Sequence, residues 1–223
     1  MQSATRYNPF VTNSLEAYVF SPKNLSELDE RLWQAYNLWF SIWGQALSEE
    51  MNIQSQLRSD NFTRAESVVA LFKNNLCVAL FTTNLFDLSN PIHRNDSYFI
   101  DWSNPTLDKL KRSRLPVMTL ENFTIGRSIR GTYDMLPWKE LLVLLALSKL
   151  LDERLPFLLS TPRKLRSMHK VAANTGASAL EVDVEYKIPG EVVDLVVWDP
   201  TSPDKVWEKE CWALAQKIWK TKN

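Results

Sequence analysis

The segment VMTLENFTIGRSIRGTYDMLPWKELLVLLALSKLLDERLPFLLS, residues 117–160, decides the fold of this chain of 223 residues. Its beginning, Val117–Ile125, is rich in apolar residues and predicts a buried strand. A charged loop, Gly126–Thr132, follows, and a proline then opens a predicted helix over Trp138–Asp152. A second apolar run predicts another strand over Pro156–Ser160. Strand, helix and strand in this order form a crossover unit, in which the two strands are parallel.

The segments after this crossover complete a predicted central unit. A helix is expected over Thr161–Thr175, and two strands over Ala179–Tyr186 and Glu191–Trp198. The Pro-Gly pair between these two strands predicts a hairpin turn. Crossover units bind anionic ligands where a loop presents backbone N–H groups at the start of a helix. We therefore look for function around the loop that follows Ile125.

Two apolar runs, Ser67–Phe72 and Leu76–Phe86, precede the central unit and predict a β-hairpin. Asn74 and Asn75 lie between them, and asparagine tolerates the positive φ that a tight hairpin turn requires. The start of the chain, Met1–Lys23, has no clear hydrophobic period, so we expect an extended segment there.

The region between the hairpin and the central unit carries weaker patterns. Leu88–Asn95 contains a proline and predicts a loop. Ser97–Trp102 predicts a short strand, and Asn104–Arg112 predicts a short helix with a proline near its start.

An aromatic amphipathic helix is predicted near the N-terminus, with Asn24 or Ser26 as its cap and its end at about Glu50. Large apolar side chains recur at three- and four-residue spacing and predict one face. That face consists of Trp33, Tyr36, Phe40, Trp43 and Leu47, widened by Leu32, Trp39 and Ile42. It forms either ordinary core or one wall of a slot for an alkyl chain, and only a cavity distinguishes the two.

A last helix is predicted after Ser202 or Asp204 and continues to about Lys220. Together these segments predict an N-terminal region at 1–65, a core at 66–199 and a C-terminal helix at 200–223, in one compact domain.

The composition excludes several classes of protein. The chain is 45% hydrophobic and 23% charged with a formal net charge of zero, which is typical of a globular domain and opposes general nucleic-acid binding. The longest apolar run is too short to span a bilayer. Cys77 and Cys211 suggest no disulfide framework, and without a signal pattern we expect a cytoplasmic protein. His93 and His169 have no clustered ligands, so no metal site is predicted.

The order of elements from Ser67 to Trp198 resembles the GNAT (GCN5-related N-acetyltransferase) superfamily. The resemblance implies a mixed α/β, mostly antiparallel sheet with helices on both faces, to which the aromatic N-terminal helix and the C-terminal helix are added. Within the superfamily the chain looks most like N-acyl amino acid synthases and acyl-homoserine-lactone synthases, which share an aromatic N-terminal helical region.

Three local matches carry the resemblance. The segment Thr119–Ile125 resembles the fourth strand of the family, which often has a glutamate at the place of Glu121. Arg127–Gly131 occupies the position of the family's pantetheine and pyrophosphate loop, and Lys170–Ala177 resembles its closing helix, which ends in glycine.

The loop departs from the family pattern of arginine, two residues, glycine, one residue, and glycine or alanine. Counted from Arg130, the two glycine positions hold Tyr133 and Met135. Counted from Arg127, they hold Arg130 and Thr132. The loop therefore lacks the glycine-rich form of the family's coenzyme A cradle.

The resemblance implies direct attack of an amine on an acyl thioester, without a covalent enzyme intermediate. Glu121 is then the candidate base, because desolvation on this strand would raise its pKa toward a useful range. Backbone N–H groups over Thr124–Gly126 are the implied donors to the oxyanion. The alternative for Glu121 is a solvated residue on the face of the strand.

The loop residues are the implied binding site for the phosphate of the thioester carrier. This site comprises Ile125, Gly126, Arg127, Arg130 and Gly131, with the two arginines as bidentate donors. The alternative is a surface loop whose arginines pair with nearby carboxylates, as surface arginines often do.

Two further features follow from the predicted helix over Thr161–Thr175. His169 is a candidate acid for the leaving sulfur, since Ala172 stands where the family often has a tyrosine, and its alternative is a structural role. Arg163, Arg166 and Lys170 would share one face, which suits an acidic acyl carrier protein or is simply solvated.

The sequence thus leads to two hypotheses. The first is an N-acyltransferase that moves an acyl group from an acyl carrier protein or acyl-CoA thioester, as co-substrate, to a small-molecule amine, without a metal. The second is a catalytically degenerate domain of the same fold used for binding or regulation.

Overall fold

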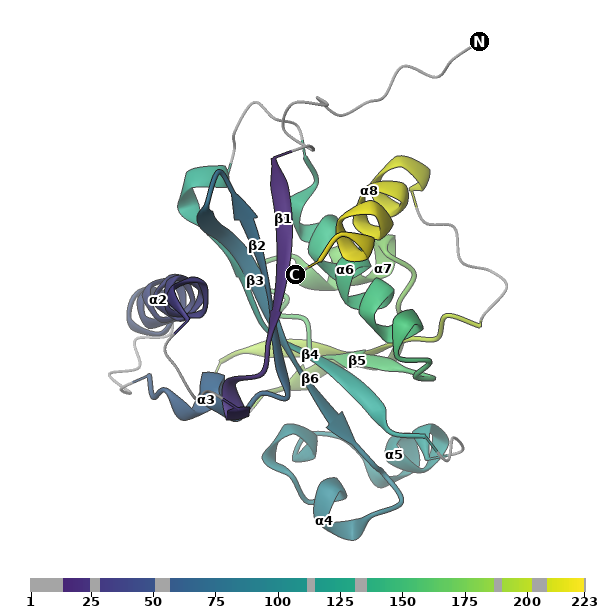
Figure 1. Ribbon diagram of the computed structural model, residues 1–223. Helices are drawn as coiled ribbons and strands as arrows, with labels where there is room; N and C mark the ends of the chain where they lie inside the picture. The colour runs from purple at the N-terminus through teal and green to yellow at the C-terminus, as the bar shows by residue number, and fades with distance from the viewer. Residues whose placement is uncertain are drawn as a thin grey trace. The chain divides into compact units, whose positions relative to one another are not determined.

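The computed structural model describes residues 14–24, 29–50, 57–111, 115–130, 136–186, 190–201 and 208–222 (Figure 1). The chain forms two compact units. The first unit comprises Met1–Thr83, Asn122–Leu145 and Glu208–Asn223, and the second comprises Asn84–Glu121 and Ala146–Trp207.

The strands form a seven-stranded sheet in the order β1-β2-β3-β4-β5-β7-β6. Their bounds are β1 Leu15–Phe20, β2 Ser67–Lys73, β3 Leu76–Phe86, β4 Val117–Ile125, β5 Leu158–Ser160, β6 Ser178–Glu185 and β7 Val192–Trp198. β4 and β5 are parallel, whereas the pairs β1–β2, β2–β3, β5–β7 and β6–β7 are antiparallel. This confirms the predicted mixed and mostly antiparallel sheet.

The helices lie between these strands along the chain and after the last of them. They are α2 Glu30–Gln45, α3 Asp60–Thr63, α4 Pro91–Arg94, α5 Asn104–Leu110, α6 Trp138–Asp152, α7 Met168–Asn174 and α8 Lys209–Lys220. Shorter helical turns occur at η1 Pro22–Asn24, η2 Ala46–Glu50, η3 Ser97–Phe99 and η4 Arg127–Ile129.

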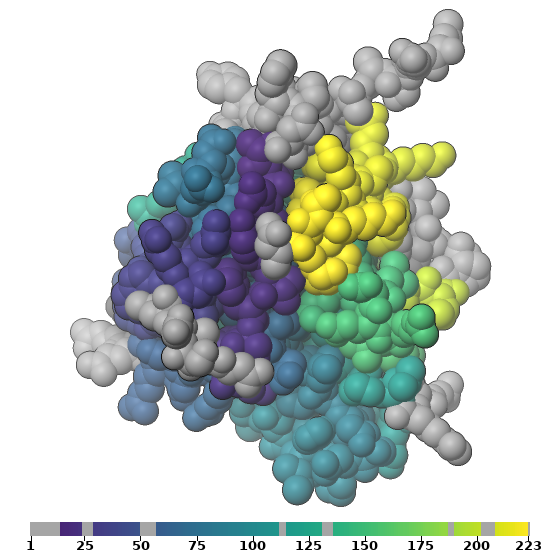
Figure 2. Space-filling view, viewed as in Figure 1, coloured from purple at the N-terminus to yellow at the C-terminus, as the bar shows by residue number. Residues whose placement is uncertain are grey.

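In the first unit, α2 and α8 cover opposite faces of the β1-β2-β3 strands (Figure 1). The α2 side is closed by a cluster of buried side chains: Leu32, Ala35, Trp39, Phe62, Val68, Ala70, Phe72 and Leu80. On the other side α8 lies along β1, as the yellow and purple surfaces of Figure 2 show. The helices predicted on both faces of the sheet are therefore present.

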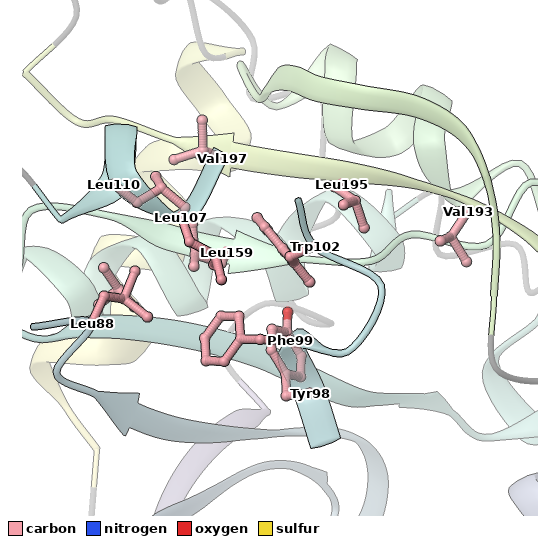
Figure 3. Close-up of a cluster of buried hydrophobic side chains, with 11 residues drawn as sticks. Leu88, Tyr98, Phe99, Trp102, Leu107, Leu110, Leu159, Val193, Leu195 and Val197 are labelled. Carbon is pink, nitrogen blue, oxygen red and sulfur yellow. The ribbon is translucent and has the colours of Figure 1, made fainter. Parts of the chain in front are cut away.

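The second unit is built on β5 and β7 and has its own apolar cluster (Figure 3). The segment between β3 and β4 covers these strands with aromatic and aliphatic side chains. The cluster consists of Leu88, Tyr98, Phe99, Trp102, Leu107, Leu110, Val117, Leu159, Val193, Leu195 and Val197.

Several sequence predictions are confirmed in detail. The strand Val117–Ile125 and the helix Trp138–Asp152 have the predicted bounds. The predicted hairpin is formed by β2 and β3, and its turn residues Asn74 and Asn75 have φ values of 53° and 65°. Asparagine is one of the few residues that adopts this left-handed conformation readily, which explains why the pair identified the turn.

Within the start of the chain, Met1–Lys23, for which an extended and partly ordered segment was expected, Leu15–Phe20 forms strand β1, which the sequence did not predict. This strand pairs with β2 along its whole length, from Leu15 opposite Lys73 to Phe20 opposite Val68. The partner is about fifty residues away in sequence, so the local pattern of a short edge strand carried little signal.

The predicted strand Ser97–Trp102 was also wrong, since Ser97–Phe99 forms a helical turn. The Asp96 side chain accepts a hydrogen bond from the Tyr98 N–H at 2.8 Å and caps this turn. Such a local cap competes with strand formation. The predicted loop Leu88–Asn95 contains the single helical turn α4.

The face of α2 differs from the predicted one. Trp33 and Phe40 are 48% and 43% exposed, whereas Leu32, Ala35 and Trp39 are buried. Leu32 and Trp39, which were predicted at the margin of the apolar face, therefore lie in the buried face of the helix. The helix begins after Asp29, whose side chain accepts hydrogen bonds from two N–H groups of the first turn, and not after Asn24. Ser26 lies outside the described residues.

The predicted helix over Thr161–Thr175 was too long, because α7 begins only at Met168. Before it, Arg163 forms an antiparallel bridge with Val193 of β7. Backbone pairing with a neighbouring strand therefore replaced the first turns of the expected helix. The last helix, α8, begins after Glu208, whose side chain accepts from the Cys211 N–H, and the predicted caps Ser202 and Asp204 lie outside the described residues.

No helix within the described ranges is long and apolar enough to cross a membrane. Cys77 and Cys211 are both free thiols.

Candidate functional site

Glu121 lies in the second unit, near the middle of β4, and is half-buried. Its Oε1 accepts hydrogen bonds from Asn84 Nδ2 at 3.1 Å and from the Thr119 hydroxyl. Asn84 also donates its backbone N–H to Thr119 Oγ1 at 3.2 Å, so the three residues form one connected cluster. Donors on two neighbouring strands hold the carboxylate in one orientation.

The backbone changes direction immediately after Glu121. Asn122 has a φ of 49°, a left-handed conformation inside an otherwise extended strand. A left-handed residue of this kind bends a strand and is typical of a β-bulge, and bulges often re-aim neighbouring side chains at functional sites. Asparagine adopts the conformation at less cost than a β-branched residue.

The side chain of Asn122 is held by three hydrogen bonds within the first unit. Its oxygen accepts from Trp39 Nε1 at 3.1 Å, and its Nδ2 donates to Thr82 Oγ1 and to the Asn61 carbonyl, both at 2.9 Å. Two positions later, Thr124 Oγ1 accepts from the indole N–H of α2 residue Trp43 at 3.1 Å and donates to the Asn122 carbonyl at 2.6 Å. The bend is therefore fixed by side chains from α2 and β3.

The loop after β4 starts with a close backbone contact. The Gly126 N–H donates to the Val78 carbonyl at 2.8 Å, and a Cβ at position 126 would lie 2.9 Å from that oxygen. Only glycine fits here without a shift of the backbone. The Gly126 N–H is thus already bonded and is not available as one of the oxyanion donors predicted over Thr124–Gly126.

The two arginines of the loop differ in their surroundings. Arg130 donates from Nε and from a terminal nitrogen to the Ile125 carbonyl, at 3.1 and 2.7 Å. Partial burial, and secondarily the neighbouring charge of Arg127, lowers the pKa of Arg130. The side chains of Arg127 and Arg130 are both exposed at the surface. Gly131 lies outside the described residues.

An open pocket of about 470 Å³ borders this loop within the first unit. It lies between α2, the β2–β3 turn and η4, and it is lined by Gln34, Asn37, Lys73, Asn74, Leu76, Cys77, Val78, Ser128 and Ile129. The lining combines amides, one lysine and aliphatic groups, and contains no carboxylate. The aromatic residues of α2 do not line it, so the buried ones among them serve as core.

His169 lies on α7 in the second unit and is partly buried. Its Nδ1 is buried and has no hydrogen-bond partner among the residues that the structure describes. Ala172, at the position where the resemblance implied a tyrosine, is buried on the same helix. The histidine therefore remains a candidate proton donor.

The predicted basic face of Arg163, Arg166 and Lys170 is not one helical face. Arg163 precedes α7 and forms an ion pair with Glu191, in which the two side chains are only 14% and 4% exposed. Burial lowers the pKa of Arg163, and nearby Tyr186 opposes this shift. Arg166 and Lys170 are exposed, so only these two belong to the surface.

Sequence reasoning missed several residues around Glu121. Asn84 and Thr119 are polar residues inside apolar strands, and that was the available signal for them. Tyr98 was missed because its segment was assigned to a strand, yet its hydroxyl is buried and has no partner within the described part of the chain. In the same ranges no group of three or more metal-binding side chains occurs.

The sequence matches no protein-family model, and no curated protein matches it. Solved structures do match its fold. FeeM, an N-acyl amino acid synthase from uncultured soil microbes, superposes with a TM-score of 0.60 and 8% identity, over 84% of this chain and 91% of FeeM.

Two acyl-homoserine-lactone synthases also have a similar fold. The CoA-dependent synthase BjaI, solved with SAM and isopentyl-CoA, has a TM-score of 0.56 and 12% identity over 92% of this chain and 89% of its own. The synthase LasI has a TM-score of 0.52 and 13% identity over 82% and 88%. The chain therefore has the GNAT fold, in the form seen in the N-acyl amino acid and acyl-homoserine-lactone synthases.

Proposed function

We propose that this protein is an N-acyltransferase that moves an acyl group from a thioester to an amine, with Glu121 as the base. The observation that supports the proposal is the orientation of the Glu121 carboxylate on β4, which is bonded by Asn84 of β3 and by Thr119 of β4. The solved structures that share the fold include acyl-transferring enzymes. A carboxylate held in one orientation is placed to accept the proton that an ammonium substrate must lose before it attacks.

In the proposed reaction Glu121 takes one proton from the substrate ammonium. The amine nitrogen attacks the thioester carbonyl carbon, and the N–H groups of Thr124 and Ile125 donate to the oxyanion that develops. The C–N bond then forms completely, the C–S bond breaks, and the thiolate leaves with the electron pair. The nitrogen loses its second excess proton to solvent as the amide forms, and His169 protonates the thiolate and regains a proton from solvent. The proton held by Glu121 also passes to solvent, so that an ammonium and a thioester give an amide, a thiol and one proton.

The donor in this proposal is an acyl thioester of coenzyme A or of an acyl carrier protein. Its phosphate would be bound by the loop, mainly by the exposed Arg127, because Arg130 already bonds the Ile125 carbonyl. Arg166 and Lys170 remain as surface cations for an acidic carrier protein. The pocket beside the loop, with Lys73 and Ser128 in its lining, suits the polar arm of either donor.

A second candidate function is a binding or regulatory domain without catalysis. The observation in its favour is that Gly126 and Arg130 of the loop are already bonded within the protein. Such a domain would bind an acyl thioester or its carrier and leave it intact.

Mass spectrometry of extracts from cells that overexpress the protein tests the proposal. The wild type should produce new N-acylated amines, and Glu121→Gln should abolish them. Glu185→Gln, which changes an exposed carboxylate on β6, is the matched control and should leave them unchanged. If wild type and Glu121→Gln give the same extract, and the purified protein binds no acyl thioester, the acyltransferase proposal fails.

A further inference from the structure

The outer face of α2 carries no charged side chain along most of its length. Residues 32–48, in α2 and the turn η2 that continues it, include no acidic or basic residue, although the helix covers one face of the strands from outside (Figure 1). Surface helices normally place charged side chains on the side opposite the core. Helix α8, on the other face of the same strands, does so with the exposed Lys209, Lys217 and Lys220. The uncharged outer face of α2 therefore differs from that of a helix which simply faces water.

Four residues form a narrow stripe along this outer face. Their spacing of four, three and four positions places them within about 60° of the helix circumference, at 100° per residue. We call these four residues the outer stripe of α2: Trp33, Asn37, Phe40 and Gly44. The side chains of Trp33, Asn37 and Phe40 are exposed. Two large apolar side chains thus lie on the surface without a charge beside them on the stripe.

The two aromatic rings of the outer stripe are held in fixed positions although they are exposed. Tyr36 stacks on both, with ring centroids 5.4 Å from Trp33 and 5.8 Å from Phe40. The Tyr36 hydroxyl in turn forms a hydrogen bond of 2.9 Å with the Ser59 hydroxyl. Rings fixed in this way lose little conformational entropy when a partner covers them. Exposed aromatic residues in a region without charge are typical of the centre of a protein interface.

Gly44 is the second unusual feature of the outer stripe. It lies within α2 and does not have a positive φ, so it is not a left-handed helix cap. Glycine destabilises the interior of a helix relative to alanine. A Cβ at position 44 would meet no heavy atom within 4 Å among the described residues outside its own helix. The described fold therefore does not require glycine here, whereas the close approach of a bulky group from another molecule would require it.

The outer stripe is complementary to itself when two copies of α2 lie antiparallel. A two-fold axis midway between positions 37 and 40 places Trp33 of each copy opposite Gly44 of the other. The same axis places Phe40 opposite Asn37. Each large side chain thus faces a smaller one, and the stripe brings no charge into the contact. The alternation of four and three positions is also the spacing that two helices use when they pack at a small crossing angle.

We propose that the outer stripe of α2 is an interface through which two copies of this chain form an antiparallel, two-fold symmetric helix pair. From Trp33 to Gly44 the contact extends over about 16 Å of helix, so the interface is small and the dimer is weak. A membrane surface fits less well, because helices that lie on membranes carry lysine and arginine beside their apolar face. The inference is independent of the acyltransferase proposal. Asn37 also lines the pocket beside the loop, so the second copy would border that pocket.

Sedimentation velocity of the purified protein over a range of concentrations tests the inference. The wild type should change reversibly from monomer to dimer between micromolar and millimolar concentration. Gly44→Leu fills the space that Trp33 of the second copy would occupy, so it should raise the dissociation constant by at least about 10-fold. Within one chain a side chain at position 44 meets no neighbour, and leucine favours a helix. Gly44→Leu should therefore unfold at no lower temperature than the wild type.

Two further variants and one control complete the test. Phe40→Gln removes the second ring of the outer stripe and should also weaken the dimer. Combining Trp33→Ala with Gly44→Leu exchanges the large and the small side chain, so this double variant should dimerise more tightly than Gly44→Leu alone. Ala213→Leu, which adds the same side chain at an exposed position of α8, is the matched control and should leave the dimer unchanged.

Several results would overturn the inference. A wild type that stays monomeric even at millimolar concentration has no such interface. A dimer that Gly44→Leu and Phe40→Gln leave intact forms through another surface. A double variant as monomeric as Gly44→Leu contradicts the antiparallel register. A monomer that binds phosphatidylcholine vesicles, and loses this binding in Phe40→Gln, would assign the outer stripe to a membrane surface instead.

Discussion

The indole Nε1 of Trp39 donates a hydrogen bond to the side-chain oxygen of Asn122 at 3.1 Å, across 83 positions of the sequence. This bond connects α2 to β4 at the left-handed residue that follows Glu121. The aromatic helix therefore has a second purpose besides filling the core. It holds the bend of the strand that carries the candidate base.

Replacement of Asn122 should show how much this bend depends on the side chain. Asn122→Ala loses three hydrogen bonds and places a Cβ residue at positive φ, so we expect the free energy of unfolding to fall by about 2–4 kcal/mol. Asn122→Gly loses the same bonds but tolerates the backbone, and should cost about 1 kcal/mol less. Urea unfolding measures both, and equal losses would contradict the left-handed conformation.

Two tryptophans of α2 can test which face of this helix is buried. Trp39 is fully buried, so Trp39→Ala should lower the free energy of unfolding by about 3–5 kcal/mol. Trp33→Ala removes a side chain that is 48% exposed and stacked on Tyr36, and should cost less than about 1 kcal/mol. Thermal or urea unfolding of the two variants measures both losses. A larger loss of stability for Trp33→Ala would support the buried face that was predicted from the sequence.

The sequence predicted the parts of the fold whose signals are local. The Asn74-Asn75 turn, the apolar run of β4 and the proline-initiated α6 all carry their conformation within a few residues. Glu121 could be singled out because it is a carboxylate inside an apolar strand. Its place in a strand of the sheet was therefore predictable.

The parts that were missed depend on contacts between distant residues. Strand β1 is stabilised by its pairing with β2. Arg163, which was predicted to lie in a helix, instead pairs with Val193 of β7. The bonds from Trp39 and Trp43 to β4 join residues more than eighty positions apart. The local pattern of residues in a single sequence does not indicate which distant residues will pair.

The stability of the second unit should depend strongly on the buried ion pair of Arg163 and Glu191. Glu191→Gln leaves a buried guanidinium without its counter-charge, so the free energy of unfolding should fall by about 3 kcal/mol. Replacement of both residues by apolar ones, Arg163→Met with Glu191→Leu, should recover most of that loss. Lys170→Gln, at an exposed position, is the control and should change stability by less than about 0.5 kcal/mol. A Glu191→Gln variant as stable as this control would show that the ion pair is not buried in solution.

Both cysteines should be unreactive in the folded protein. Burial raises the pKa of Cys77 and that of Cys211 to about 12, so each thiol remains protonated at pH 8. Because the thiolate is the reactive form, iodoacetamide should label them roughly 10³-fold more slowly than an ordinary thiol of pKa near 9. Peptide mass spectrometry after native and denatured labelling measures this, and fast native labelling of either cysteine would contradict the raised pKa of its thiol.

The same shifts predict a dependence of stability on pH. The unfolded chain loses its thiol protons near pH 9, whereas the folded chain keeps them until about pH 12. The cysteine contribution to the free energy of unfolding is therefore complete below pH 9 and is lost as the pH rises toward 12. A Cys77→Ala and Cys211→Ala double variant should lack this decline when urea unfolding is followed from pH 8 to 11.

The central claim is that Glu121 accepts the proton of an amine that attacks an acyl thioester. Amine-dependent release of free thiol from acyl-CoA and acyl carrier protein donors by the purified protein measures this reaction most directly. The account predicts release by the wild type and by Glu185→Gln, and a loss of about 10²- to 10⁴-fold in Glu121→Gln at unchanged stability. Equal rates in wild type and Glu121→Gln, or no amine-dependent release with any donor, would contradict it.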